Sequence, residues 1–149
     1  MVSETIKNEV GPVLIWGAGA VGGTIGAALS RAGIRVQMVD VNIEHCQACS
    51  EIGLKITGPV ETYLQRVPCV TPKNLTGTFN RIILAVKGPS TANAVNDLVK
   101  HLPDNGYVLS AQNGLAEHYL SQRIGVKRVM GGFVNLGCLL YTSDAADDR

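Results

Sequence analysis

Residues 13–26 read VLIWGAGAVGGTIG, and this stretch decides the fold. It begins with an uninterrupted apolar run, residues 13–16, of the kind that forms a central parallel strand covered on both faces. A glycine-rich turn follows, and apolar residues then recur at helical spacing until Gly33, which predicts a helix with one apolar face. A strand, a tight turn and a helix therefore follow one another in that order.

The turn carries the pattern Gly-x-Gly-x-x-Gly over residues 17–22. The first glycine allows a sharp turn off the strand, the second allows the backbone to approach a pyrophosphate, and the third allows the helix to pack closely on the strand. Unpaired amides at the positive end of the helix would then hold the phosphates. We expect a dinucleotide-binding Rossmann domain with these cofactor-binding residues: Gly17, Ala18, Gly19, Ala20, Val21 and Gly22.

Asp40 ends the second predicted strand, residues 35–40, and lies 18 residues after Gly22. An acid at this place can accept hydrogen bonds from the adenosine ribose hydroxyls. A 2′-phosphate beside the carboxylate would meet a like charge, so Asp40 favours NAD over NADP. Two alternatives stay open: Asp40 is an ordinary acid at a strand end, or Arg31 or Arg35 supplies a cation for a 2′-phosphate.

The rest of the chain alternates strands and helices, which predicts an α/β fold with a doubly wound, mostly parallel sheet. Further elements are expected as helices over residues 43–52, 91–101 and 116–123, and as strands over residues 82–86, 107–110 and 129–136. Residues 54–70 are rich in β-forming residues and interrupted by prolines, which indicates a small strand-rich excursion. We expect one domain over residues 1–137.

Composition and charge limit the kinds of partner. The formal net charge is +1 and the charges are dispersed, so neither nucleic acid nor an anionic membrane is an expected partner. Residues 12–30 are uncharged and long enough to span a membrane, but their five glycines disfavour a continuous helix. We therefore expect a small-molecule partner and, because no signal pattern opens the chain, a cytoplasmic location.

The cysteines do not predict a metal or redox site. Cys46 and Cys49 fall inside the predicted helix, where no N-terminal dipole would lower a thiol pKa, so we expect reduced, packed thiols. His45 adjoins the pair, but neither His101 nor His118 stands at a recognisable ligand spacing. No metal is expected.

Lys87 and Asn113 follow two later strands at their carboxyl ends, where ligands bind in open α/β sheets. An ammonium group can hold a carboxylate or phosphate, and an amide can donate and accept, so both residues suit a keto acid or the nicotinamide ribose. Taken alone, these residues do not exclude a simpler interpretation, in which Lys87 is a solvated loop lysine and Asn113-Gly114 is an ordinary turn.

The order of these motifs resembles the ketopantoate reductase family, the 2-dehydropantoate 2-reductases. The matching pieces are residues 17–23 with Gly26, residues 53–56 (GLKI), Val86-Lys87 with Thr91, and residues 112–114 (QNG). The resemblance implies that this domain binds the nicotinamide cofactor, with Lys87 and Asn113 beside cofactor and substrate. It implies an oxidoreductase of pantothenate biosynthesis that reduces a 2-keto acid such as 2-dehydropantoate to the 2-hydroxy acid. Such enzymes typically use NADP with a basic residue after the second strand, and Asp40 departs from that pattern.

The resemblance also implies that this chain is an N-terminal fragment. Family members continue into a helical C-terminal domain that supplies a lysine as general acid. We therefore assign no catalytic residue here, expect the chain alone to be inactive, and expect any homodimer to form through the missing domain. Alternatives are another hydroxyacid or sugar dehydrogenase, a non-catalytic NAD-sensing regulatory module, and an interaction domain with a vestigial loop.

The last residues, 138–149 (CLLYTSDAADDR), show neither a helical nor a strand period. They resemble the translation of a sequencing-library adapter, and a native disordered terminus is the alternative. We expect a non-native or disordered tail and exclude it from fold and function.

Overall fold

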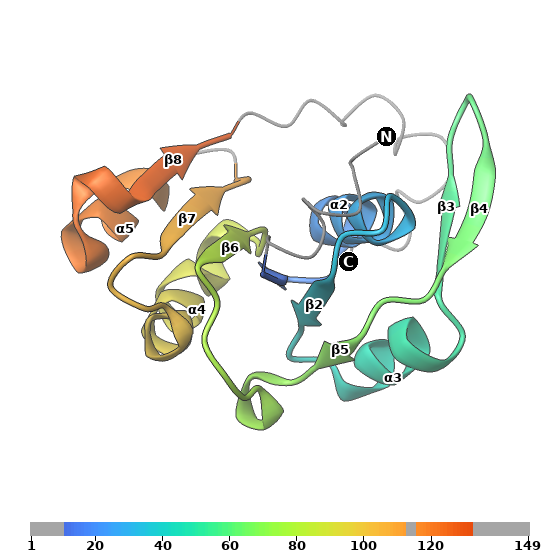
Figure 1. Cartoon of the computed structure of the whole chain (residues 1–149), viewed down its shortest axis with the longest axis horizontal. Helices are drawn as coiled ribbons and strands as arrows, with labels where there is room; N and C mark the ends of the chain where they lie inside the picture. Colours follow the sequence, from blue (N-terminus) through green and yellow to red (C-terminus); the bar gives the residue numbers. More distant parts are fainter. Residues whose placement is uncertain (1–10, 113–115, 133–149) are drawn as a thin grey trace.

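The computed structural model describes residues 11–112 and 116–132. Its main element is a six-stranded sheet with the order β5-β2-β1-β6-β7-β8, in which every pair of neighbours is parallel (Figure 1). The strands are β1 (Val13–Trp16), β2 (Val36–Val39), β5 (Cys69–Val70), β6 (Arg81–Leu84), β7 (Tyr107–Ser110) and β8 (Val129–Gly131). The chain winds outward from the central β1 in both directions, as the sequence predicts.

Helices connect successive parallel strands. They are α2 (Ala20–Arg31), α3 (Ile43–Glu51), α4 (Thr91–Leu98) and α5 (Ala116–Ile124), with 3-10 turns η1 (Pro72–Asn74), η2 (Gly88–Ser90), η3 (Val99–His101) and η4 (Val126–Arg128). The expected helix over residues 91–101 is thus α4 continued by η3. Of the expected strand over residues 129–136, β8 covers the first three residues, and residues 133–136 lie outside the described part.

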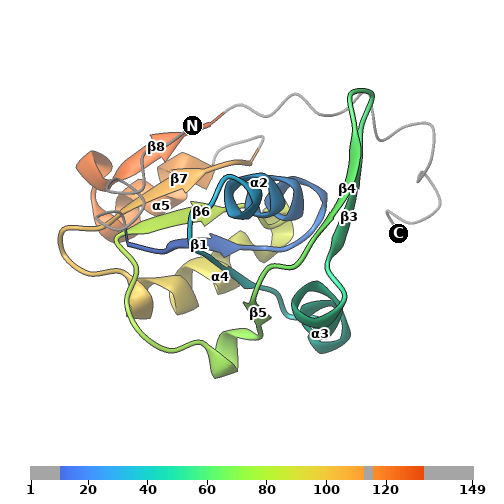
Figure 2. The same ribbon diagram turned by 45° about the vertical axis from the view of Figure 1, so that its right-hand side comes forward.

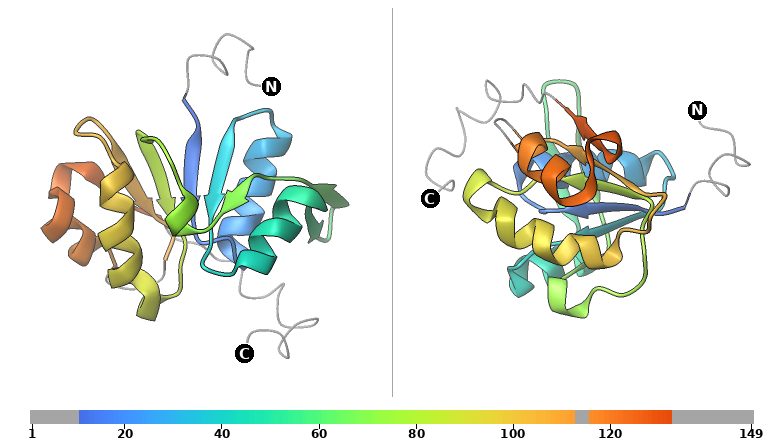
Figure 3. Two further views of the ribbon diagram at one scale, coloured as in Figure 1. Left: turned by 90° about the horizontal axis from the view of Figure 1, so that it is seen from below. Right: turned by 90° about the vertical axis from the view of Figure 1, so that its left-hand side faces the viewer.

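Alternate residues of β1 face two separate cores, because side chains of a strand point to opposite faces. Leu14 and Trp16 pack with residues of α4 and α5, whereas Val13 and Ile15 pack with residues of α2 and α3. Figure 3 shows the two pairs of helices on opposite faces of the sheet. Burial on both faces explains why the β1 sequence is apolar throughout rather than alternating.

The strand-rich excursion forms a hairpin and one edge strand. β3 (Leu54–Thr57) and β4 (Thr62–Gln65) pair antiparallel with each other and not with the main sheet, and they project from its side (Figure 2). Arg31 at the end of α2 holds the hairpin, because its guanidinium forms a two-bond ion pair with Glu61 and lies 4.2 Å from the centre of the Tyr63 ring. The chain then returns to the main sheet as β5, a strand that the sequence pattern does not specify.

Two further sequence expectations concern a membrane-spanning helix and the C-terminal tail. Within the described residues, no helix is both long and apolar enough to cross a membrane. The tail proposed over residues 138–149 lies outside the described part.

Candidate cofactor site

The glycine loop lies where the carboxyl ends of β1, β2 and β6 meet. Gly17 turns the chain with φ +102°, and a Cβ there would lie 2.8 Å from the backbone carbonyl of Ala85, after β6. Its N–H donates to the Val39 carbonyl of β2 at 2.8 Å. Gly17 therefore needs to be glycine both for its dihedral angle and for the close approach of a neighbouring strand.

Two further glycines allow α2 to lie directly on the sheet. A Cβ on Gly22 would overlap the Gly17 carbonyl oxygen, and a Cβ on Gly26 would lie 2.8 Å from the Met38 sulfur of β2. Both positions are buried. The sequence-based roles of Gly17 and Gly22 agree with these contacts.

Gly19 is different, because no heavy atom lies within 4 Å of the Cβ that it lacks. It is exposed and forms the N-cap of α2, where no side chain of the described residues caps the helix. Its carbonyl accepts the Gly23 N–H at 2.7 Å, which starts the helix directly after the loop. The first amides of α2 thus face open space beside a residue without a side chain, and an anion can approach them closely.

Two side chains fix Ala18 in the middle of the loop. Asp40 Oδ2 accepts the Ala18 N–H at 3.0 Å, and His45 Nε2 lies 2.6 Å from the Ala18 carbonyl oxygen. A carbonyl oxygen can only accept, so Nε2 carries the hydrogen and donates it. Asp40 Oδ1 also accepts the Asn42 N–H at 3.0 Å. Asp40 therefore organises the loop itself, a role that the sequence analysis did not anticipate.

His45 reaches Ala18 because of how α3 begins. Asn42 is the N-cap of α3, and its side chain accepts the His45 N–H at 3.1 Å. This capping fixes the first turn of the helix immediately after β2. His45 was considered only as a metal ligand at the sequence level, and the single available signal was its place five residues after Asp40.

The two cations that could have served a 2′-phosphate lie elsewhere. Arg31 is the last residue of α2, at the opposite end of the helix from the glycine loop, and is paired with Glu61. Arg35 precedes β2, whereas Asp40 follows it. Residues 40–44 (DVNIE) contain no basic side chain. Neither arginine accompanies Asp40.

The second part of the site follows β6 and β7. Lys87 is exposed and precedes η2, so it lies at the carboxyl end of β6 as expected. Asn113 lies outside the described residues. Its neighbour Gln112 is buried and donates from Nε2 to the Val86 carbonyl at 2.5 Å and to the Thr91 hydroxyl at 2.9 Å. Gln112 thus fixes the backbone next to Lys87.

Gln112 also presents an acceptor whose partner is not among the described groups. Its Oε1 is buried and makes no hydrogen bond within the described residues, and the same holds for Ser110 Oγ at the end of β7. Buried polar atoms usually have partners. These atoms mark this end of β7 as polar, and sequence reasoning treated Gln112 only as part of a motif.

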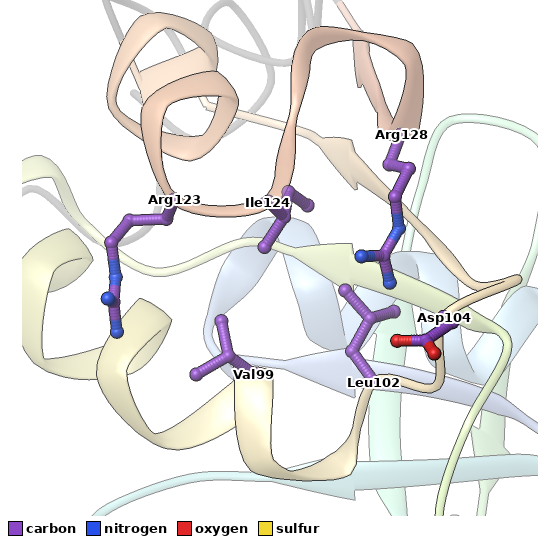
Figure 4. A pocket seen from close by; sticks show the side chains of 6 residues that line it. All are labelled: Val99, Leu102, Asp104, Arg123, Ile124 and Arg128. Carbon is purple, nitrogen blue, oxygen red and sulfur yellow. The ribbon is translucent and has the colours of Figure 1, made fainter.

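A separate pocket of about 290 Å³ lies between η3 and the end of α5, near the amino ends of β7 and β8 (Figure 4). It is lined by Val99, Leu102, Asp104, Arg123, Ile124 and Arg128. Arg128 donates to the carbonyls of Pro103 and Gly106, and Arg123 donates to the Asn96 side chain. Because both guanidinium groups already hold structural partners and the pocket adjoins the amino end of β7, it is not part of the glycine-loop site.

Comparisons with known proteins agree with this geometry. Residues 13–142 match the family model described as Ketopantoate reductase PanE/ApbA. A 2-dehydropantoate 2-reductase of Pyrococcus abyssi (strain GE5 / Orsay) is 32% identical over 133 residues, which cover 86% of this chain and 41% of that protein. The chain therefore spans less than half the length of this curated relative.

Solved structures share the fold. A PanE/ApbA family ketopantoate reductase of Ralstonia eutropha JMP134 superposes with a TM-score of 0.70 at 26% identity, over 83% of this chain and 40% of that one. D-mandelate dehydrogenase, solved as a ternary structure with NADH and anilino(oxo)acetate, has a TM-score of 0.75 at 23% identity, over 83% and 40% of the two chains.

Proposed function

The chain belongs to the ketopantoate reductase PanE/ApbA family, and on this premise we propose that it is the dinucleotide-binding part of an oxidoreductase that reduces a 2-keto acid to the 2-hydroxy acid. The observation that carries the proposal is the open surface at Gly19, where the uncapped first turn of α2 meets a residue without a side chain. The pyrophosphate of NAD or NADP fits this surface, because its oxygens can accept hydrogen bonds from the helix amides.

Hydrogen bonds from the protein itself constrain the loop. Asp40 accepts the Ala18 N–H and His45 donates to the Ala18 carbonyl, so both backbone polar groups of Ala18 are held by side chains. A fixed loop loses less conformational entropy on binding. We propose the loop residues 17–22 and Asp40 as cofactor-binding residues, with His45 as a positioning residue that acts through Ala18.

We propose NAD as the preferred dinucleotide. The Asp40 carboxylate would repel a 2′-phosphate, and Arg31 and Arg35 lie away from it. The family resemblance argues for NADP, so the ratio of the two affinities is the quantity to measure.

Lys87 and Asn113 are our candidates for contacts with the substrate carboxylate and the nicotinamide ribose. Lys87 follows β6 at the same end of the sheet as the glycine loop, and Gln112 donates to the backbone carbonyl of Val86, the residue before Lys87. The bound dinucleotide supplies the hydride. Lys87 would orient the keto acid through its carboxylate, and Asn113 would hold the ribose with its amide.

The general acid for the keto oxygen is not assigned to any residue of this chain. The curated relative is more than twice as long, since the matched part is 41% of it. We propose that this chain binds cofactor without turnover, and that catalysis and homodimer formation require the remainder of a full-length reductase. Steady NADH consumption with 2-dehydropantoate by this chain alone would contradict the proposal.

Calorimetry with a matched pair of glycine variants tests the cofactor site. A Gly19→Ala methyl group meets no protein atom within 4 Å, so the variant should fold normally but obstruct the pyrophosphate. Gly58→Ala, in the β3–β4 turn, is the control, because its methyl group makes only an ordinary contact at 3.6 Å. We expect NADH affinity to fall at least tenfold in Gly19→Ala alone. Equal affinities in the two variants, or no binding of either dinucleotide by the parent chain, would reject the site.

A further inference from the structure

The buried side chain of Gln112 joins two segments that follow neighbouring strands. Gln112 comes two residues after the end of β7 and is 8% exposed. Its Nε2 donates to the Val86 carbonyl at 2.5 Å and to the Thr91 hydroxyl at 2.9 Å. A backbone carbonyl can only accept, so the contact with Val86 fixes which end of the amide is the nitrogen. Both hydrogens of this nitrogen therefore hold the segment between β6 and α4.

The two acceptors of Gln112 are the ends of the turn that carries Lys87. Val86 comes directly before Lys87, and Thr91 is the first residue of α4. Between them lies the 3-10 turn η2, which is closed by the Ser90 N–H donating to the Lys87 carbonyl at 2.9 Å. One amide thus holds both ends of a turn whose middle is fixed by its own backbone.

The start of this segment lies against the glycine loop. The Ala85 N–H donates to the Trp16 carbonyl at 2.8 Å, and a Cβ on Gly17 would lie 2.8 Å from the Ala85 carbonyl. The sheet order has β6 and β7 on one side of β1, and β2, which Asp40 follows, on the other (Figure 1). With the pyrophosphate at the loop and the adenosine ribose on Asp40, the nicotinamide half of a dinucleotide extends towards the Lys87 turn.

We propose that Gln112 is a positioning residue for the nicotinamide half of the dinucleotide, and that it acts through the turn at residues 86–91. The inference rests on the function proposed above. In this role Gln112 contacts the turn rather than the ligand, and its amide keeps the Lys87 backbone at a fixed place beside the nicotinamide ribose. Its two donations reach neither the glycine loop nor Asp40. The adenosine diphosphate half should therefore bind independently of Gln112.

Calorimetry of the full chain with NADH and with ADP separates this role from a general effect on folding. Gln112→Met keeps a side chain of similar length without a donor, and the Oε1 that it replaces makes no hydrogen bond within the described residues. We expect NADH affinity to fall about fivefold and ADP affinity to change less than about twofold, since residues in direct contact are coupled to this extent. ADP lacks the nicotinamide half, so a merely structural effect would not distinguish the two ligands.

Gln65→Met, in β4, is the matched control. Gln65 Nε2 also donates to a hydroxyl and to a backbone carbonyl, those of Ser30 and Arg66, each at 3.2 Å. The same substitution there should leave the ratio of NADH to ADP affinity unchanged. Thr91 supplies a second pair that retains Gln112: Thr91→Val removes one acceptor and should lower the ratio, whereas Thr91→Ser keeps the hydroxyl and should not. This pair decides the question if Gln112→Met does not fold.

The outcomes distinguish this inference from the proposed function. Equal losses of NADH and ADP affinity in Gln112→Met, or an unchanged ratio in both Gln112→Met and Thr91→Val, would overturn the role of Gln112 alone. A parent chain that binds neither ligand would reject the glycine-loop site, and this inference with it. A parent chain that binds NADH no more tightly than ADP would reject the contact between the Lys87 turn and the nicotinamide half, which would leave Gln112 nothing to position.

Discussion

Replacing Asp40 should weaken the fold and change the cofactor preference by two separable effects. Its two carboxylate oxygens accept different backbone hydrogens, Oδ2 that of Ala18 and Oδ1 that of Asn42, each at 3.0 Å. Ala18 is 1% exposed and Asp40 is half-buried, so water reaches the Ala18 N–H less easily than that of Asn42, which is exposed. The two hydrogen bonds therefore differ in the cost of losing them.

A graded pair of substitutions follows from this difference. Asp40→Asn has one acceptor oxygen, which can serve Ala18, so the free energy of unfolding should fall by only about 1 kcal/mol. Asp40→Ala leaves the Ala18 N–H buried without an acceptor and should cost about 2–3 kcal/mol. For a domain of this size each kcal/mol corresponds to roughly 2–8 °C in Tm, so thermal unfolding without cofactor resolves the series.

Binding provides the second measurement. Asp40→Asn removes the charge that opposes a 2′-phosphate, so the ratio of NADPH to NADH affinity should rise at least tenfold, about 1.4 kcal/mol. Glu61→Gln is the matched control, because it makes the same acid-to-amide change at the far end of α2 and should leave the ratio unchanged. The reasoning fails if Asp40→Ala is as stable as the parent chain, or if Asp40→Asn and Glu61→Gln show the same ratio.

Three further predictions concern other parts of the fold. Gly22→Ala should abolish NADH binding in calorimetry and lower the Tm, because its methyl group overlaps the Gly17 carbonyl oxygen; unchanged binding would contradict the packing described. Gln112→Leu should destabilise the chain by about 1–3 kcal/mol in denaturant unfolding, because it removes the donor to the Val86 carbonyl. A decrease in the free energy of unfolding of less than about 0.5 kcal/mol, as is usual for a substitution at the surface, would argue against that hydrogen bond. The ultraviolet absorbance of thiolate should titrate near pH 7 and disappear in Cys49→Ser, because hydrogen bonding from Cys69 lowers the Cys49 pKa; no titration below pH 8 would refute it.

The parts of the fold that the sequence predicts are those with local signals. β1, the glycine loop and α2 follow from an apolar run, three glycines and a helical period, all within residues 13–33. The second strand and the second helix were also predicted, over residues 35–40 and 43–52, and the structure has them as β2 and α3 with boundaries within one residue. Such signals are local because they arise from backbone geometry and from the period of each element.

The parts that were not predicted depend on contacts between distant segments. β5 has only two residues, too few to show a period, and its pairing with β2 decides that it is a strand. The hydrogen bond from His45 to Ala18 spans 27 residues and exists only because α3 packs beside the loop. The lowered pKa of Cys49 has the same origin, since its main cause is Cys69 on β5 rather than the helix dipole that the sequence analysis considered.

The short length of β5 also bears on how the protein avoids self-association. An outer strand normally offers a row of unsatisfied amides and carbonyls to which another chain can add. Here the outward N–H and C=O of Cys69 both bond to one hydroxyl, Ser50 Oγ of α3, at 3.0 and 3.3 Å. This border of the sheet therefore gives a second molecule no ladder to extend, which protects the concentrated protein from aggregating there.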